Sequence, residues 1–347
     1  TLQAMFEYQT MICELTGMDV ANASVYDGAS ACSEACLLAA QATRRQKILI
    51  ADTLHPDTEA VLATTARFSG LDLVRIGHEP GRGSVSMADL QNELDNQTAA
   101  LLVQYPNFFG ILDDLPALAE AVHAHHALLV VSTDPIALGL LQPPGEAGAD
   151  LVVGDGQALG LPLSFGGPSL GFFAARKTLM RRIPGRVVGQ TRDARGARRY
   201  VVTLQTREQH IRREKATSNI CTNQGLNALA ATIYLALMGP HGLAQAAEQS
   251  TRQAHALYQR LLEIPGFSPV FDGPFFKEFT VRFAGDLTDL NQALDRDGFI
   301  GGLALESVRT DLAGLWLVAV TEKRTDADLD GLIASIQAFV AQGGLGS

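Results

Sequence analysis

The triplet Gly28-Ala29-Ser30 could bind an anion. It directly precedes residues 31–45, whose apolar pattern predicts a helix. Backbone N–H groups and the dipole at the start of a helix attract negative charge, and the Ser30 hydroxyl would add a donor. An ordinary helix N-cap is the alternative, because serine is common at that position. The triplet therefore indicates an anion site only if other binding residues lie beside it.

Three further polar side chains follow predicted strands: His55, Asn107 and Asp134. An imidazole at this place could stack on a flat ring, and a carboxylate could pair with a protonated ring nitrogen. Each also has a simpler interpretation. His55 could be a solvated loop residue, and Asp134 could cap a turn, since Pro135 follows it. The position that they share, at the ends of strands, is the stronger signal.

The elements that would position these residues alternate between strand and helix. Short runs rich in Leu, Val and Ile are separated by helical patterns such as residues 115–127. This arrangement predicts an α/β fold with a mostly parallel sheet that is covered on both faces. Ligands of such sheets bind at the carboxyl ends of the strands. The predicted strands are residues 47–52, 72–77, 99–106, 127–132 and 150–155.

The pattern changes after residue 223. A long helical stretch follows, broken at Gly239-Pro240, and then come strands at 275–283 and 315–320 with a helix after each. We therefore expect a large domain over residues 1–240. A small C-terminal α/β domain is expected over residues 241–347, entered by the long helix.

Taken together, these motifs resemble the fold-type-I pyridoxal-phosphate (PLP) enzymes, an aminotransferase-like family. The resemblance implies that Gly28, Ala29 and Ser30 hold the cofactor phosphate, with His55, Asn107 and Asp134 around the ring. In that family a lysine at the start of a glycine-rich turn forms a Schiff base with PLP. Here Gln157 stands at that place, 23 residues after Asp134. An amide nitrogen cannot condense with an aldehyde, so Gln157 cannot anchor the cofactor.

A more specific resemblance covers essentially the whole chain. Residues 1–31, 153–174, 203–224 and 235–243 are similar to the α subunit (subunit 1) of the two-subunit prokaryotic glycine decarboxylase, the P-protein of the glycine cleavage system. Members of that group extend further at the N-terminus. This chain begins without Met, and we therefore expect that upstream sequence is missing.

That resemblance implies a non-catalytic subunit with a vestigial PLP pocket. The β subunit would carry the lysine and PLP, in an αβ or α2β2 assembly. The complex would decarboxylate glycine, release CO2 and pass the aminomethyl group to the lipoyl arm of the H-protein. Residues 215–224 are the candidate for a loop that reaches the partner's cofactor, through Ser218, Asn219 and Thr222. The alternative is that this loop only links domains and caps the long helix.

Two rival interpretations remain open. The chain could be a stand-alone PLP enzyme that uses an unrecognised lysine among Lys47, Lys177, Lys215, Lys277 and Lys323. It could also be a scaffold or regulatory paralogue that has kept the fold without a part in catalysis.

Composition excludes several classes of partner. A formal net charge of −10 argues against nucleic acid and anionic membranes. The four cysteines lack the spacing of a disulfide framework, which fits a reducing compartment such as the prokaryotic cytoplasm. No metal site is expected, because Cys32 and Cys36 have no further ligands in sequence reach.

Overall fold

The computed structural model describes residues 1–345 and divides into two compact units. The first unit consists of Thr1–Gly77, Val85–Tyr105 and Asp114–Ala244. The second takes the loops His78–Ser84 and Pro106–Asp113 together with the chain from Gln245 onward. The domains expected from sequence, 1–240 and 241–347, did not include these two loops in the C-terminal part.

The first unit is built on a seven-stranded sheet in the order β1-β7-β6-β5-β4-β2-β3. The five strands from β3 to β6 in this order run parallel, and β7 and β1 add an antiparallel edge. The expected mostly parallel sheet is confirmed. Strands β4 and β6 are buried along nearly their whole length, as an apolar run covered on both faces requires. The strands are β1 (Val20–Ala21), β2 (Lys47–Ala51), β3 (Asp72–Ile76), β4 (Thr98–Tyr105), β5 (Leu128–Thr133), β6 (Leu151–Asp155) and β7 (Gly171–Ala175).

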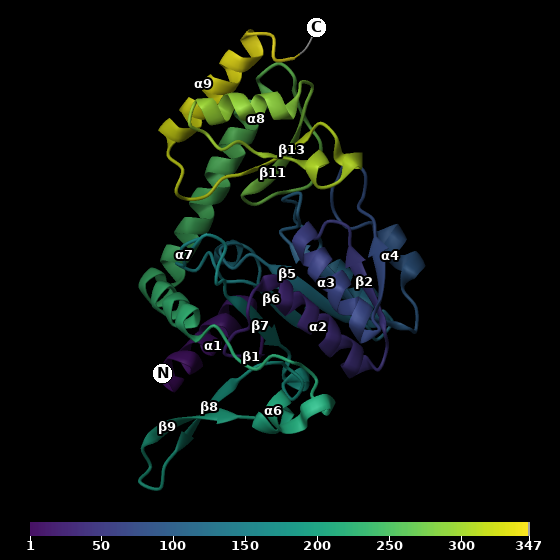
Figure 1. Ribbon diagram of the computed structural model, residues 1–347, viewed down its shortest axis with the longest axis vertical. Coiled ribbons are helices and arrows are strands. Elements are labelled where there is room, and N and C mark those ends of the chain that lie inside the picture. Colours follow the sequence, from purple (N-terminus) through teal and green to yellow (C-terminus); the bar gives the residue numbers. More distant parts are fainter. Residues whose placement is uncertain (346–347) are drawn as a thin grey trace. The chain divides into compact units, whose positions relative to one another are not determined.

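Helix α2 packs closely on this sheet because the side chains on its inner face are small. Ala31, Cys32, Ala35, Cys36 and Ala39 are all fully buried there. Figure 1 shows α2 and α3 together beside the strands. The helices of this unit are α1 (Leu2–Thr16), α2 (Gly28–Thr43), α3 (Pro56–Ser69), α4 (Met87–Glu93), α5 (Leu115–Ala124), α6 (Gln209–Arg212) and the first part of α7 (Gly225–Leu262).

Two features follow β7. A hairpin of β8 (Val187–Arg192) and β9 (Arg198–Thr203) forms a separate two-stranded sheet. Helix α7 is interrupted at Gly239, whose φ of 59° and ψ of −178° are not helical, and Pro240 follows. The break predicted at Gly239-Pro240 is confirmed.

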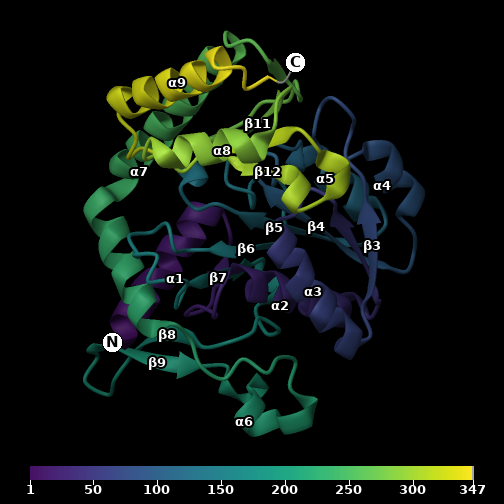
Figure 2. The same cartoon turned by 45° about the horizontal axis from the view of Figure 1, so that its top comes forward.

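The second unit has a four-stranded antiparallel sheet in the order β10-β11-β13-β12. Its strands are β10 (Phe267–Pro269), β11 (Glu278–Phe283), β12 (Leu303–Ala304) and β13 (Leu315–Ala319). Helices α8 (Leu287–Arg296) and α9 (Asp326–Ala341) lie side by side, as Figure 2 shows. The core of the unit includes Trp316, Phe279 and Val281, which are almost completely buried.

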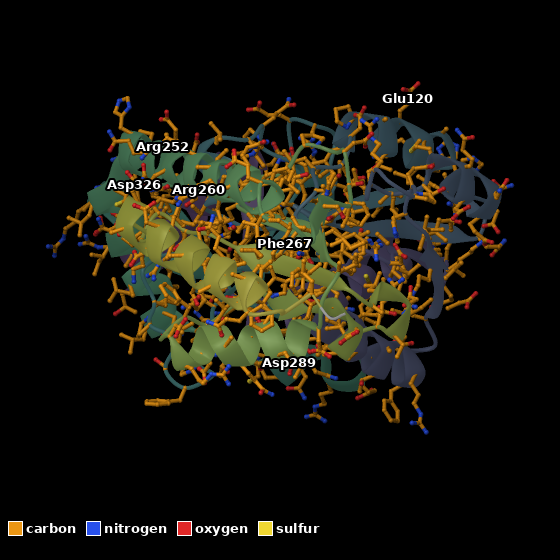
Figure 3. The ribbon with its side chains drawn as sticks, turned by 90° about the horizontal axis from the view of Figure 1, so that it is seen from above. Glu120, Arg252, Arg260, Phe267, Asp289 and Asp326 are labelled. Atoms are coloured by element: carbon orange, nitrogen blue, oxygen red, sulfur yellow. The ribbon has the colours of Figure 1, made fainter. Side chains whose placement is uncertain are left out.

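The C-terminal part of α7 runs beside α9 (Figure 3). The Gln253 side chain donates to Asp326 at 3.1 Å, and Arg260 forms a 2.9 Å ion pair with Asp330. These contacts hold the part of α7 after Ala244 against α9 within the second unit. None of the helices in residues 1–345 combines the length and the apolar character needed to cross a membrane.

Candidate functional site

The carboxyl ends of the parallel strands bring the predicted site residues of the first unit to one edge of the sheet. His55 follows β2, Asp134 follows β5, and Gln157 follows β6. The start of α2 lies against the end of β6, because a Cβ added at Gly28 would be 2.9 Å from the Asp155 nitrogen. Glycine is therefore required at position 28 for this close approach.

Helix α2 begins at Gly28, three residues earlier than the sequence pattern indicated. The expectation that residues 28–30 precede the helix is wrong: Asp27 is the N-cap, and its carboxylate accepts from the Ser30 N–H at 2.7 Å. The Gly28 N–H donates to the Asp155 carboxylate at 3.0 Å. Two N–H groups of the predicted phosphate site therefore bind carboxylates of the chain itself.

Asp155 gathers donors from three segments. Besides Gly28, its carboxylate accepts from the Gln157 N–H at 2.8 Å and from the Ser169 hydroxyl at 2.5 Å. Sequence reasoning missed both Asp155 and Ser169. Asp155 did carry a signal, because it is a carboxylate at the end of a predicted strand. Its partner Gly28 is 127 residues away in the sequence, which no local pattern reveals.

Gln157 is partly buried in the turn that follows β6. Its side-chain nitrogen donates to the Leu161 carbonyl at 2.8 Å, which closes the turn locally. Gln157, the residue at the predicted lysine position, thus forms a side-chain hydrogen bond within its own turn.

His55 and Asp134 both hold the start of the segment that follows them. His55 is the N-cap of α3, and its Nδ1 accepts from the Asp57 N–H at 3.2 Å. The backbone N–H of His55 donates to the Gln104 side-chain oxygen at 2.8 Å. Asp134 accepts from the Ile136 N–H at 2.9 Å, which is the turn-capping arrangement considered above. The structure gives each residue this local structural role, and their predicted cofactor contacts stay predictions.

Asn107 lies in the second unit and is completely buried. Its amide nitrogen donates to the Gly83 carbonyl and to Asp113, and its oxygen accepts from the N–H groups of Phe109 and Ile111. A side-chain amide offers two donors and two acceptor positions. All four are filled by the protein, so Asn107 organises its own loop.

Residues 215–224 are tied to the first unit at several points. Ser218 accepts from the Ile220 N–H, Ile220 is buried, and Asn223 donates to the Ala23 carbonyl. The Ser218 hydroxyl also hydrogen-bonds Glu34 of α2. Asn219 and Thr222 are exposed. Of the three residues predicted to reach a partner, Ser218 is thus engaged within this chain, whereas the other two face solvent.

Burial raises the pKa of Glu34 to about 6, although the hydrogen bond from Ser218 acts in the opposite direction. A carboxyl group removed from water resists ionisation, and desolvation is the larger effect here. Glu34 is therefore a partly buried acid that contacts the 215–224 loop through Ser218.

The lysines do not gather at the carboxyl edge of the sheet. Lys47 begins β2 at the opposite edge, where it pairs with Glu93 and Asp95 at 3.2 and 3.1 Å. Lys177 follows β7, which is antiparallel, so it also lies at the opposite edge. Lys215 lines a surface pocket with Arg181, Arg182 and Arg212. Lys277 and Lys323 belong to the second unit. Among residues 1–345 no group of three or more His, Cys, Asp or Glu is arranged to hold a metal ion.

Comparison with known proteins identifies the family. A family model described as the glycine cleavage system P-protein matches residues 1–336. The chain belongs to this family. Among curated members of the P-protein family, the probable glycine dehydrogenase (decarboxylating) subunit 1 of Carboxydothermus hydrogenoformans is 52% identical over 332 residues, which are 96% of this chain and 74% of that protein. The subunit 1 of Thermomicrobium roseum is 50% identical over 342 residues, 98% of this chain and 76% of that protein.

Solved structures agree with this assignment. A glycine decarboxylase (P-protein) in inhibitor-bound form is 45% identical with a TM-score of 0.91, over 97% of this chain and 75% of that one. A sphingosine-1-phosphate lyase from Burkholderia pseudomallei is 16% identical with a TM-score of 0.73, over 99% of this chain and 77% of that one. A NifS-like protein is 14% identical with a TM-score of 0.67, over 98% and 88%. The last two show likeness of fold alone. The expected α/β fold of the type-I PLP enzymes is confirmed, and with it the resemblance to subunit 1 of the glycine cleavage enzyme.

Proposed function

We propose that this chain is the non-catalytic α subunit of a glycine dehydrogenase (decarboxylating) of the glycine cleavage system. The β subunit would carry the lysine and PLP, in an αβ or α2β2 assembly. The complex would decarboxylate glycine and transfer the aminomethyl group to the lipoylated H-protein. The setting we propose is the prokaryotic cytoplasm.

The observation that carries this proposal is Gln157. It stands at the position where the sequence predicts the lysine of PLP enzymes, and its side-chain amide donates to the Leu161 carbonyl. Lys47 and Lys177 lie at the opposite edge of the sheet, which gives no support to a stand-alone PLP enzyme. When bound in the β subunit, PLP would supply the electron sink for decarboxylation. This chain would contribute a contact surface for the β subunit and side chains that reach its pocket.

A candidate contact surface for the β subunit lies on the first part of α7. Leu226, Leu229, Ile233 and Leu237 are all exposed, the first and last at 79% and 82%. At about 100° per residue, this spacing places them on one face of the helix. Residues 216–247 contain no charged side chain at all. Interface cores are depleted of charged residues, so this apolar face supports a partner subunit there.

The glycine-rich turn after Gln157 lies beside that helix. Asn227 donates to the carbonyls of Pro168 and Ser169, and a Cβ at Gly160 would be 2.8 Å from the Tyr234 ring. The turn exposes Leu163 and Phe165. The charge-free turn 156–170 thus continues the apolar face of α7 toward the strand ends. The exposed Asn219 and Thr222 belong to the segment that leads into α7, and we propose that they reach the β-subunit pocket.

Reconstitution tests the proposal. The lysine-bearing β subunit, this chain and the two together are each assayed for CO2 release from glycine with lipoylated H-protein and PLP. We expect activity only when both subunits are present. Full activity of the β subunit alone would contradict a role of this chain in catalysis, and the scaffold interpretation would then be favoured. Activity of this chain alone would mean that it is a PLP enzyme in its own right.

The loop is tested in the same assay. The double variant Asn219→Ala/Thr222→Ala should weaken PLP retention by the complex, because both side chains are free to face a partner. Ser218→Ala is the matched comparison, since it alters a contact within this chain. Unchanged PLP retention in the double variant would show that Asn219 and Thr222 do not contribute to the β-subunit pocket.

A further inference from the structure

The residues at the start of α2 do not fit a PLP phosphate in this chain. A phosphate site there needs free N–H groups, yet those of Gly28 and Ser30 already bind Asp155 and Asp27. We infer that the Asp155 carboxylate is a built-in anion that occupies the phosphate position and keeps PLP and other phosphates out of this chain. The inference rests on the proposed function, since the cofactor would then belong to the partner subunit.

The hydrogen bonds around Asp155 form a complete cradle for an anion. One carboxylate oxygen accepts from the Gly28 N–H, and the other accepts from the Gln157 N–H and the Ser169 hydroxyl. Backbone N–H groups at a helix start together with a hydroxyl are the donors that phosphate sites use. In this chain a donor set of the same kind binds the Asp155 carboxylate at the end of β6.

Space and charge both oppose a second anion. The α2 start touches β6 so closely that a Cβ at Gly28 would be 2.9 Å from the Asp155 nitrogen and 3.1 Å from the Gly154 carbonyl carbon. Asp27 places a second carboxylate on the same turn. A phosphate would therefore have to displace Asp155 and lie beside Asp27, where like charges repel.

A buried hydroxyl lies within electrostatic range of this carboxylate. Tyr8 of α1 is 1% exposed, and its hydroxyl has no hydrogen-bond partner among the described residues. Burial raises the pKa of Tyr8, and the charge of Asp155 adds to that effect.

The experiment uses the chain alone with inorganic phosphate and PLP as probes, in equilibrium dialysis. Wild type should show no saturable binding of either. Asp155→Ser removes the carboxylate and opens its volume. Asp155→Asn removes the charge but keeps the shape and the acceptor for Gly28, so it is the variant expected to fold if the first does not. We expect Asp155→Ser to bind phosphate saturably, at least about tenfold more tightly than any residual binding by wild type, with PLP competing for the same site. Asp155→Asn still fills the volume but lacks the charge, so it should show a smaller, measurable gain.

Asp134→Asn is the matched control, because Asp134 is also a strand-end carboxylate, and its hydrogen bond from the Ile136 N–H caps a turn and does not involve the start of α2. It should bind phosphate no better than wild type. Saturable binding to the wild type with the same affinity as to the variants overturns the inference, as does a folded Asp155 variant without any gain. Because no partner subunit is present, the outcome is independent of whether reconstitution yields glycine decarboxylation.

Discussion

Single carboxyl groups in this chain have very different surroundings. Asp155 and Asp27 bind backbone N–H groups at the start of α2, whereas Glu34, less than two turns further along the same helix, is largely removed from water. Hydrogen bonds from N–H groups favour a charged carboxylate, and burial disfavours it. Of these three carboxyl groups, Glu34 is the one whose pKa is raised by burial.

Glu34 makes stability depend on pH. Its folded-state pKa of about 6 lies above the ordinary value of 4.5, so the folded chain binds the proton more tightly than the unfolded chain. Stability is then greatest below the unfolded pKa and is lost as the pH rises through the folded pKa. Glu34→Gln should stabilise the chain by about 1–2 kcal/mol at about pH 8, and the gain should have nearly disappeared at about pH 4, below the unfolded pKa.

Urea unfolding at both pH values measures this difference. Glu120→Gln is the control, because Glu120 is exposed at the surface of α5 (Figure 3) and its replacement should change stability little at either pH. An equal gain for Glu34→Gln at both pH values would show that charge burial is not the cause.

At the scale of elements, the break in α7 depends on one residue. Gly239 combines a φ of 59° with a ψ of −178°, a region that only glycine enters readily. No atom lies within 4 Å of a Cβ added there, so a substitution meets backbone strain without a steric clash. Gly239→Ala should lower the free energy of unfolding by about 1–3 kcal/mol.

Gly242→Ala is the matched comparison, three residues further along the same helix. The three atoms nearest to its Cβ would belong to the Met238 side chain, at 3.3–3.5 Å, and alanine is the better helix former. Thermal unfolding of both variants separates the effects, since Gly242→Ala should be neutral or stabilising. Equal destabilisation of the two would mean that the break tolerates a side chain.

The elements could be predicted from sequence wherever the signal was local. The parallel strands follow from apolar runs between helical patterns, and the α7 break follows from Gly239-Pro240. The contents of the site depended on contacts between distant residues. Gly28 with Asp155, and Asn107 with Gly83, are pairings that only the folded chain reveals. For this reason the sequence placed Asn107 in a ligand pocket, whereas the fold uses its amide inside a loop.

At the scale of the whole molecule, charge is distributed very unevenly. Residues 176–215 contain 13 Lys and Arg but only 3 Asp and Glu, in a chain with a formal net charge of −10. This segment includes the β8–β9 hairpin and α6, and four of its exposed cations (Arg181, Arg182, Arg212 and Lys215) surround one surface pocket. Such a patch attracts anionic surfaces even when the whole molecule is acidic.

The chain should therefore bind a sulfonate cation-exchange resin at about neutral pH and low salt, despite its sequence pI near 5.3. Neutralising the four pocket cations to Gln should lower the salt concentration needed for elution. A second variant that neutralises Arg67, Arg252, Arg296 and Lys323 loses the same number of charges from exposed positions elsewhere, and it should elute close to wild type. Equal shifts for the two variants would mean that net charge governs binding, because a local patch is the only property in which they differ by design.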